Sequence, residues 1–284
     1  MNQKSYNNTP TLYIIPTPIG NMDDITIRAI KIMTLVEVLY VEDTRITSLL
    51  LKKHKITKKL ISNNTFNEKE NIESCLKYLS DGFSVGLVSD RGTPLISDPG
   101  SMLVKTIIDN KYNVVALPGA TAFVPALVMS GISAQRFTFV GFLSSKENEL
   151  KKQLEILKDN EETLIFYESP NRIIKTLDIM AEILLNRQIS ISREISKKFE
   201  EVYRGTLCST TSLQIKPKGE FVIVVSGNIE EYDESISTNQ NVDIYVKQGF
   251  SIMEAIKKTA KEQKKTKSEV YDEYHKIDRR KLWK

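Results

Sequence analysis

Metal-binding residue types are scarce in this chain. Its 284 residues include two cysteines, Cys75 and Cys208, and two histidines, His54 and His275. These four residues show neither the CxxC spacing nor the Cys/His clustering of a structural zinc site. We therefore expect no bound metal. So few cysteines also fit a protein of the reducing cytoplasm.

Long hydrophobic runs are missing as well. The longest, Val85–Val88 and Phe221–Val225, fall far short of the roughly 20 apolar residues that a membrane-spanning helix needs. The segment Met1–Pro10 is polar and has no apolar signal core. With 40% hydrophobic and 27% charged residues, the composition is typical of a soluble globular protein. The sequence thus predicts a cytoplasmic protein that does not bind membranes.

Acidic residues are outnumbered in the last part of the chain. The formal net charge is +4, but residues 242–284 alone carry +5, which leaves the rest close to neutral. Residues 229–241 are polar, with little apolar content, and predict a linker. Helical spacing then predicts helices over 242–248, over 251–261 and from Ser268 to Tyr274. This basic unit, 242–284, resembles a helix-turn-helix, with a small packing module that binds no ligand as the alternative.

Short apolar runs alternate with segments of helical period up to about residue 225. The alternation predicts an α/β fold with a mostly parallel sheet, in two α/β domains over 1–118 and 119–228. The expected strands are Leu12–Ile15, Val38–Val41, Val85–Ser89, Val114–Leu117, Phe137–Gly141, Thr163–Tyr167, Ile189–Arg193, Glu201–Leu207 and Glu220–Val225. The expected helices are Thr26–Thr34, Glu68–Ser80, Ser101–Asn110, one that starts at Thr121, Glu149–Leu157 and Arg172–Leu184.

The loops that follow the expected strands are the candidate sites, because open α/β sheets bind ligands at the carboxyl ends of their strands. Pro16–Asn21 and Ser89–Gly100 are rich in proline and glycine, and the second also holds Asp90 and Asp98. Glycine lets a ligand approach the backbone closely, and Asp90 suits ribose hydroxyls or an ammonium group. For residues 98–100 an ordinary turn before a helix is the alternative.

Three further loops carry small or charged residues. Pro118–Ala122 opens a helix with small side chains, which leave room for a ligand or merely provide an N-cap. Glu168–Arg172 and Glu42–Arg45 each place carboxylate and guanidinium groups after a strand. Such groups can hold a hydroxyl or a phosphate, or they can form a solvated ion pair.

Common catalytic signatures are absent. The chain has no GxSxG elbow, no Walker P-loop and no GxGxxG dinucleotide fingerprint. Glu42 does stand about 20 residues after Gly20, where a Rossmann fold has its ribose-binding acid. With a single glycine in the loop, a nicotinamide oxidoreductase is a weak hypothesis.

Four strings together resemble the tetrapyrrole methylase superfamily: TPIGN at 17–21, EDTR at 42–45, SDRGTPLISDPG at 89–100 and FYESPNR at 166–172. In order and spacing they are similar to its ribosomal RNA small subunit methyltransferase I branch, over nearly the whole chain. The resemblance implies two α/β domains with S-adenosylmethionine in the cleft between them, a homodimer, and a helix-turn-helix extension. It also implies methylation of the ribose 2'-hydroxyl of a decoding-region cytidine in 16S ribosomal RNA, in an assembled or nearly assembled small subunit.

The resemblance assigns residues to the cofactor cleft. They are Pro18, Ile19, Gly20, Asp90, Gly92, Thr93, Thr121, Ala122, Phe166 and Tyr167. Arg91 stands where the family usually has a small residue, so its side chain either turns outward or reaches the methionine carboxylate of the cofactor. The cofactor brings the reactive methyl group, and a metal is not required.

Histidine is missing from three positions where the family often shows it, namely Phe66, Asn171 and Phe199. We therefore expect a carboxylate to accept the proton of the hydroxyl, and the candidates are Glu42, Asp43 and Glu68.

Contacts with RNA are expected from polar and basic side chains, since phosphate neutralisation dominates nucleic-acid affinity. The candidates are Arg45, Asn67, Arg172 and Arg193. Structural ion pairs are the alternative for the arginines. Two other functions stay open: methylation of a tetrapyrrole intermediate, and a non-catalytic role as an RNA-binding assembly factor.

Overall fold

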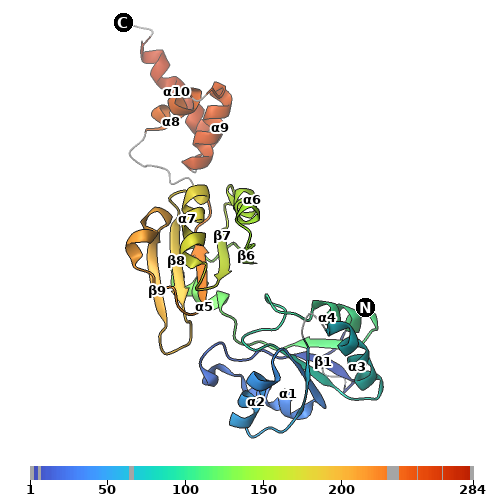
Figure 1. The fold of residues 1–284 in the computed structure, drawn as a ribbon. Helices are drawn as coiled ribbons and strands as arrows, with labels where there is room; N and C mark the ends of the chain where they lie inside the picture. The colour runs from blue at the N-terminus through green and yellow to red at the C-terminus, as the bar shows by residue number, and fades with distance from the viewer. Residues whose placement is uncertain are drawn as a thin grey trace. The chain divides into compact units, whose positions relative to one another are not determined.

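The computed structural model describes residues 3–5, 8–63, 67–228, 237–247, 249–263 and 265–281. The chain forms two compact units, Met1–Asn228 and Ile229–Lys284 (Figure 1). The larger unit holds two α/β domains, each built on its own five-stranded sheet. Strand β5 (Asn113–Ala116) ends the first domain, and helix α5 (Phe123–Ser130) packs on the sheet of the second.

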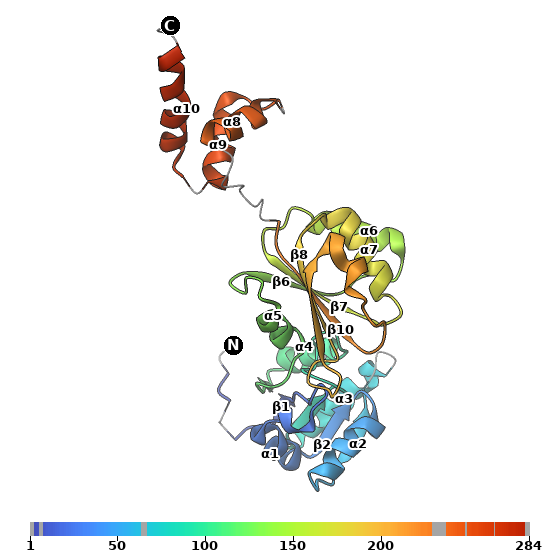
Figure 2. The same ribbon diagram turned by 90° about the vertical axis from the view of Figure 1, so that its left-hand side faces the viewer.

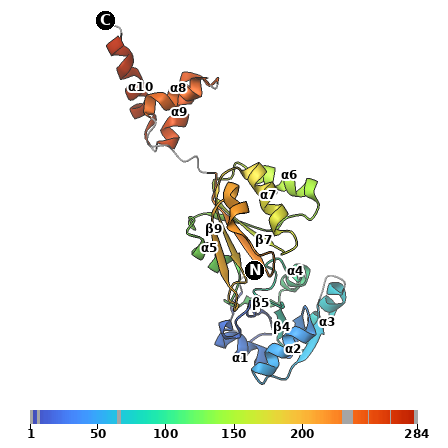
Figure 3. The ribbon, with the colours of Figure 1, turned by 60° about the vertical axis from the view of Figure 1, so that its left-hand side comes forward.

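The first sheet is parallel throughout, in the order β3-β2-β4-β1-β5. Besides β5 it contains β1 (Thr11–Ile14), β2 (Val38–Val41), β3 (Lys59–Ser62) and β4 (Val85–Val88). Parallel strands are covered on both faces, and every residue of β2 is buried. One face packs against α1 (Ile27–Leu35) and α2 (Thr44–Lys53), and the other against α3 (Glu68–Ser80) and α4 (Ser101–Asp109) (Figure 3).

The second sheet has the order β6-β7-β10-β8-β9. Its strands are β6 (Phe137–Phe142), β7 (Thr163–Glu168), β8 (Gln188–Arg193), β9 (Glu201–Thr206) and β10 (Phe221–Val225). Helices α6 (Glu147–Leu157) and α7 (Ile173–Leu184) cover one face, and α5 covers the other (Figure 2).

Strand directions differ between the two sheets. In the second, β6 and β7 are parallel, whereas β7–β10, β10–β8 and β8–β9 are antiparallel. The prediction of a mostly parallel sheet is therefore right for the first domain and wrong for the second. For β8 and β9 the physical reason is their connection: no α-helix separates them, and a strand can reverse beside its neighbour through a short loop.

The C-terminal unit contains α8 (Thr238–Lys247), α9 (Ile252–Glu262) and α10 (Lys267–Lys281). Its small core includes Val242, Tyr245 and Ile256. Because α8 begins at Thr238, the prediction that the linker extends to residue 241 is wrong. The part of the predicted linker over 229–236 lies outside the described residues.

Within residues 1–228, the predicted strands and helices are confirmed, with ends that differ by at most two residues. The sequence pattern missed α2 and β3. Strand β3 lies at the edge of its sheet and is only partly buried, so it has no apolar run.

In the part of the chain that the structure describes, no helix has the length and apolar character to cross a membrane, and no cluster of three acidic, His or Cys side chains is arranged to hold a metal.

Candidate active site

The loops after β1 and β4 lie side by side at the carboxyl edge of the first sheet. Thr17 and Gly92 exchange two backbone hydrogen bonds of 2.9 and 3.0 Å, and the Thr17 hydroxyl donates to the Ser89 carbonyl at 3.1 Å. Gly92 has a φ of +86°, which would strain any residue with a side chain. A Cβ at Gly92 would also lie 3.3 Å from Ile19 Cγ2. The two loops predicted to bind the cofactor thus share one backbone frame.

A pocket of about 230 Å³ opens beside this frame. Pro18, Gly20 and Asp90, all predicted to bind the cofactor, line it together with part of α2. Two cations also line it: Arg91 from the first domain, whose direction the sequence left open, and Lys197 from the second, which was not predicted. Both α/β domains therefore contribute to this pocket.

Three carboxyl groups gather where β2 and β4 end: Glu42, Asp90 and Asp98. Asp90 Oδ1 accepts the backbone N–H of Asp43 at 3.0 Å, and the N–H of Asp90 donates to Glu42 Oε2 at 3.4 Å. Burial raises the pKa of Asp98 to about 6, reinforced by the charge of Glu42 and opposed by a hydrogen bond with Ser89. Burial likewise raises the pKa of Asp90. The sequence did not single out Asp98, because Asp-Pro-Gly is also an ordinary way to begin a helix.

Asp43 has a different environment from its neighbours. It is the N-cap of α2, and it accepts the Arg45 backbone N–H at 2.8 Å and the Arg45 Nη2 at 2.5 Å. These bonds from Arg45 lower the pKa of Asp43 to about 2. A carboxylate so engaged is a weak proton acceptor near neutral pH. Glu68 begins α3, but its side chain lies outside the described residues, as does Phe66.

The loop from residue 93 onward reaches the second domain. The Thr93 hydroxyl donates to the Ala120 carbonyl at 2.9 Å. Ile19, Ala122 and Tyr167 belong to one apolar cluster, which also includes residues of α5 and β10. Five of the residues predicted to bind the cofactor are thereby brought together across the domain boundary: Ile19, Thr93, Thr121, Ala122 and Tyr167.

Tyr167 lies at the carboxyl end of β7. Burial raises its pKa, against a hydrogen bond with Thr121. Its ring makes edge contacts with Phe139 and Phe142, with centroids 5.0 and 5.6 Å apart. Thr121 does not cap α5, since the N-cap residue is Ala122 and it forms no side-chain cap bond. The hydroxyl of Thr121 instead faces the tyrosine.

Phe166 does not lie with Tyr167. It is 1% exposed and packs in the core between the second sheet and helices α6 and α7. Successive side chains of a strand point to opposite faces, so Phe166 and Tyr167 cannot both face the cleft. Of the strand end predicted to close the cleft, the Tyr167 side chain is therefore the one in the cluster with Ile19 and Ala122, and a contact of Phe166 with the cofactor stays a prediction.

The residues predicted to bind RNA have different surroundings. The Arg45 side chain is 88% exposed beside Asp43. Arg172 pairs with buried Glu168 at 3.4 Å and donates to the carbonyls of Leu143 and Ser144 at 3.0 and 2.8 Å. These contacts favour the structural alternative for Arg172 and leave Arg45 accessible.

Arg193 is 7% exposed and pairs with Glu201 at 2.9 Å, which likewise favours a structural role. Asn67 is the N-cap residue of α3, where its Nδ2 donates to the Ser62 carbonyl at 2.9 Å and its Oδ1 accepts from Asn71 at 3.3 Å. Both residues thus have protein partners in this structure.

Comparison with known proteins places this geometry in a family. A model of the tetrapyrrole (corrin/porphyrin) methylases matches residues 11–210. The chain belongs to this family. It is 43% identical to the ribosomal RNA small subunit methyltransferase I of Bacillus subtilis (strain 168), over 93% of this chain and 94% of that one. It is 40% identical to the protein of the same name from Halalkalibacterium halodurans, over 96% and 98%.

Among solved structures, the fold is similar to that of a uroporphyrin-III C-methyltransferase from Thermus thermophilus in complex with S-adenosyl homocysteine. The TM-score is 0.52 at 15% identity, over 76% of this chain and 97% of that one. This likeness confirms the predicted fold, with its two α/β domains of the methylase type.

The prediction of S-adenosylmethionine as cofactor is confirmed by membership of the methylase family. The residues present fit such a group. At Gly92 the backbone is left open between Ile19 Cγ2 and the Ala120 carbonyl, in a space that a Cβ would fill. Asp90 lines the adjacent pocket with a carboxylate that suits hydroxyl or ammonium groups.

Proposed function

We propose that this protein methylates small-subunit ribosomal RNA with S-adenosylmethionine, at the ribose 2'-hydroxyl of a decoding-region cytidine in 16S RNA. One observation carries the proposal: the relatives named ribosomal RNA small subunit methyltransferase I align over more than nine-tenths of both chains. The loops at the pocket supply the groups that such a cofactor and a ribose need. As substrate we propose the assembled or nearly assembled subunit.

In the proposed reaction the cofactor supplies an electrophilic methyl group. Asp90, Gly92 and Thr93 would hold it at one side of the pocket that both domains line, and the rest of that pocket would receive the nucleotide. The ribose hydroxyl would lose its proton as its oxygen accepts this methyl group, and a carboxylate of the protein would take up that proton. Of the candidates, Glu42 fits better than Asp43, whose carboxylate Arg45 already engages. Holding the reacting atoms about 3 to 3.5 Å apart removes much of the entropic barrier.

Methylation of a tetrapyrrole is the second candidate, because the family as a whole is described by that substrate. The +5 charge of residues 242–284 favours RNA. An RNA-binding assembly factor without catalysis would not need the shared frame of Thr17 and Gly92 or the pocket beside it.

The deciding experiment uses small subunits purified from a strain that lacks the corresponding gene. These subunits are incubated with the protein and methyl-labelled cofactor, and the labelled nucleotide is mapped. We expect label on one cytidine, at a bond that resists alkaline hydrolysis because the 2'-oxygen is blocked. Label on a base, or none on RNA, refutes the proposal. Transfer of label to a uroporphyrin-type tetrapyrrole would support the second candidate instead.

Cofactor binding is measured separately by calorimetry. We expect saturable binding of S-adenosylmethionine that Asp90→Ala abolishes or weakens more than tenfold, because the aspartate lines the pocket. Absence of binding at millimolar cofactor would refute a methyltransferase of any substrate.

Residues 242–284 are proposed to hold the RNA, and the protein is proposed to act in the cytoplasm as a homodimer. Deletion of residues 242–284 should weaken binding to the small subunit at least tenfold and leave the cofactor affinity unchanged. Equal losses of both would contradict a separate role for this unit.

The proposed homodimer has its own test. Light scattering after size-exclusion chromatography should give twice the mass of the 32.4 kDa chain.

A further inference from the structure

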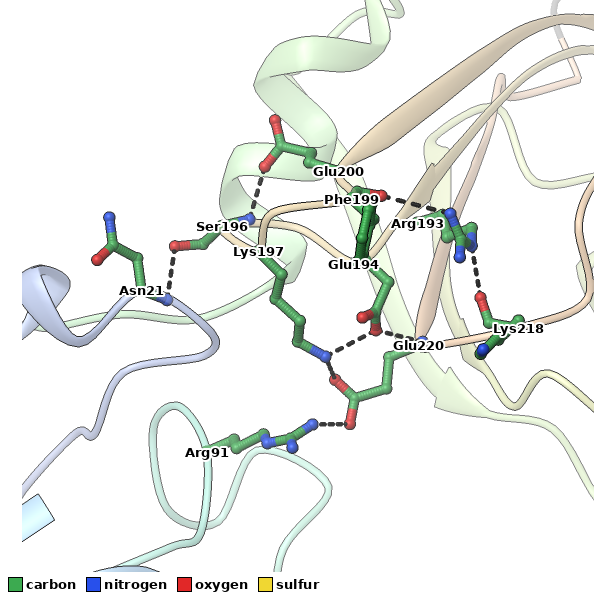
Figure 4. Close-up of polar contacts among 10 residues, drawn as sticks. All are labelled: Asn21, Arg91, Arg193, Glu194, Ser196, Lys197, Phe199, Glu200, Lys218 and Glu220. Atoms are coloured by element: carbon green, nitrogen blue, oxygen red, sulfur yellow. Dashed lines mark hydrogen bonds and ion pairs between the residues drawn. The ribbon is translucent and has the colours of Figure 1, made fainter. Parts of the chain in front are cut away.

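The loop over residues 194–200, which joins β8 to β9, contacts the first domain (Figure 4). The backbone N–H of Asn21 donates to the Ser196 hydroxyl at 3.3 Å, and that hydroxyl donates to the Asp24 carboxylate. Glu194 and Ser196 have φ values of +53° and +68°, which residues with a side chain seldom adopt. Such a conformation persists where surrounding contacts fix it. The loop is therefore held against the turn that follows β1.

Lys197 crosses from this loop to the pocket. It packs directly on Gly20, where any Cβ would overlap Lys197 Cγ, and its side chain is 19% exposed. Its Nζ donates to Glu194 Oε1 and to Glu220 Oε2, each at 2.7 Å. Burial alone would raise the pKa of Glu194, but the bonds from Lys197 and the Glu220 backbone lower it on balance. Glu194 is therefore a charged and fixed partner of Lys197.

Glu220 forms an ion pair with a second cation as well. Its other oxygen, Oε1, pairs with Arg91 on the first domain, so that one carboxylate bridges two pocket cations from two domains (Figure 4). The Glu220 side chain is 61% exposed, against 19% for Glu194. Its backbone N–H is fixed separately by Glu194 Oε1 at 3.0 Å. The side chain of Glu220 can therefore turn into solvent while strand β10 stays in place.

We propose that Arg91 and Lys197 bind a phosphate of the substrate RNA strand, and that this phosphate takes the position that Glu220 holds in the free protein. The inference rests on the proposed function, because RNA is the source of the phosphate. A carboxylate that bridges a guanidinium and an ammonium presents two oxygens at the positions where phosphate oxygens bind.

The charges around the pair are consistent with the exchange. In the free protein the two positive charges of Arg91 and Lys197 are balanced by the two negative charges of Glu194 and Glu220. When the Glu220 side chain turns away, the remaining three groups carry a net charge of +1. Asp90, an acidic residue that lines the pocket, is turned to the backbone N–H of Asp43. Apolar side chains of Met22, Ile46 and Leu50 line the same pocket, and they limit the screening of these charges by water.

The test measures binding of a fluorescently labelled fragment of the decoding-region RNA to the full-length protein, by anisotropy at several salt concentrations with S-adenosyl homocysteine present. The variants are Glu220→Gln, Arg91→Met, Lys197→Met and the double variant Glu220→Gln/Lys197→Met. As a matched control, Lys151→Met and Glu182→Gln alter an exposed ion pair between α6 and α7. Thermal unfolding of each variant establishes that it is folded.

We expect Glu220→Gln to tighten RNA binding about threefold to tenfold, because an internal competitor is weakened. Arg91→Met and Lys197→Met should each weaken it about fivefold to tenfold and lower the slope of log affinity against log salt by about one. The double variant Glu220→Gln/Lys197→Met should not show the tighter RNA binding of Glu220→Gln. The control variants should leave both quantities unchanged, and the cofactor affinity should stay within twofold throughout.

Unchanged or weaker RNA binding in Glu220→Gln would overturn the inference and make the bridge a purely structural link between domains. Loss of cofactor binding without loss of RNA binding in Arg91→Met and Lys197→Met would also overturn it, since the anion would then be the cofactor's own carboxylate. These outcomes differ from failure of the proposed function. In that case the wild-type protein itself would neither bind the fragment nor methylate the subunit, and both proposals would fall.

Discussion

In the second domain a carboxylate with 1% side-chain exposure, that of Glu168, is fully provided with donors. The Thr176 hydroxyl and the Ser169 backbone N–H each donate to it at 2.7 Å, and Arg172 lies 3.4 Å away. In the first domain Asp98 is partly buried near two other carboxylates, Glu42 and Asp90, and its pKa is raised to about 6. The buried carboxylate of the second domain therefore stabilises the fold. In the first domain, carboxylates lie close together at the sheet edge, an unfavourable arrangement that is common in functional sites.

The largest effect is expected from Glu168→Ala. The substitution leaves the Thr176 hydroxyl and the Ser169 N–H without their acceptor, so the free energy of unfolding should fall by about 3 kcal/mol. Urea denaturation followed by circular dichroism measures it. Glu182→Ala is the control, because this residue lies on α7 with 63% side-chain exposure and pairs with Lys151; it should change stability by less than about 0.5 kcal/mol. Equal losses in the two variants would show that burial of Glu168 does not matter.

Asp98→Asn should act in the opposite direction. Because the folded state raises the pKa of Asp98 to about 6, from roughly 3.9 in an unfolded chain, the folded protein binds the proton more tightly. The free energy of unfolding should therefore decrease as the pH rises from about 4 to about 6, by about 2 kcal/mol.

The asparagine variant should lack this decrease. Between pH 4 and pH 7 its free energy of unfolding should therefore fall less than that of the wild type. Urea denaturation at a series of pH values measures the difference. If the free energy of unfolding changed with pH in the same way in the wild type and the variant, Asp98 would not be destabilising, and the proposed difference from Glu168 would be contradicted.

Gly20→Ala tests how the two domains meet. The new Cβ would overlap Lys197 Cγ and lie 3.2 Å from the Ile195 carbonyl, so the loop over 194–200 must shift. We expect the cofactor affinity to fall about tenfold, since Gly20 lines the same pocket as Asp90. The double variant Gly20→Ala/Lys197→Ala removes the Cγ atom and should recover most of the loss in calorimetry. No recovery would place the damage in the β1 loop itself.

The smallest effect concerns the cysteines, one in each domain. Cys75 is fully buried in the first domain, and burial raises its pKa to about 12, whereas Cys208 in the second is exposed. A thiol reagent should label one thiol per native chain and two after denaturation, without loss of cofactor binding. Labelling removed by Cys208→Ser identifies the residue. Rapid reaction of Cys75 would mean that the first domain opens more readily than its packing suggests.

Much of the first domain could be predicted from its sequence, because the inner strands β1, β2 and β4 are buried and read as short apolar runs, whereas the edge strand β3 is only partly buried and was missed. The same regularity places Pro18, Gly20, Asp90 and Gly92 at one sheet edge. In the second domain the strand Ile189–Arg193 was found, but its antiparallel pairing was not, since pairing depends on partners distant in the sequence.

Lys197 is a site residue that the sequence could not reveal. Nothing near Lys197 in the sequence distinguishes it from the other lysines, and its place in the pocket follows from the contact of its loop with Asn21 and Gly20. For Phe166 and Tyr167 the motif leaves a question open: the alternation along β7 allows one of two neighbouring aromatic rings to face the cleft, and the motif alone does not say which.

The connection between β8 and β9 has a consequence for how the protein folds. These strands are consecutive and antiparallel, and residues 194–200 join them, so their contacts are local in the sequence. The β1–β5 pairing of the first sheet, Thr11 with Asn113, must instead close a loop of about a hundred residues. Local pairings form faster than distant ones. During refolding, the hairpin that carries Lys197 should therefore form before the sheet edge that receives it.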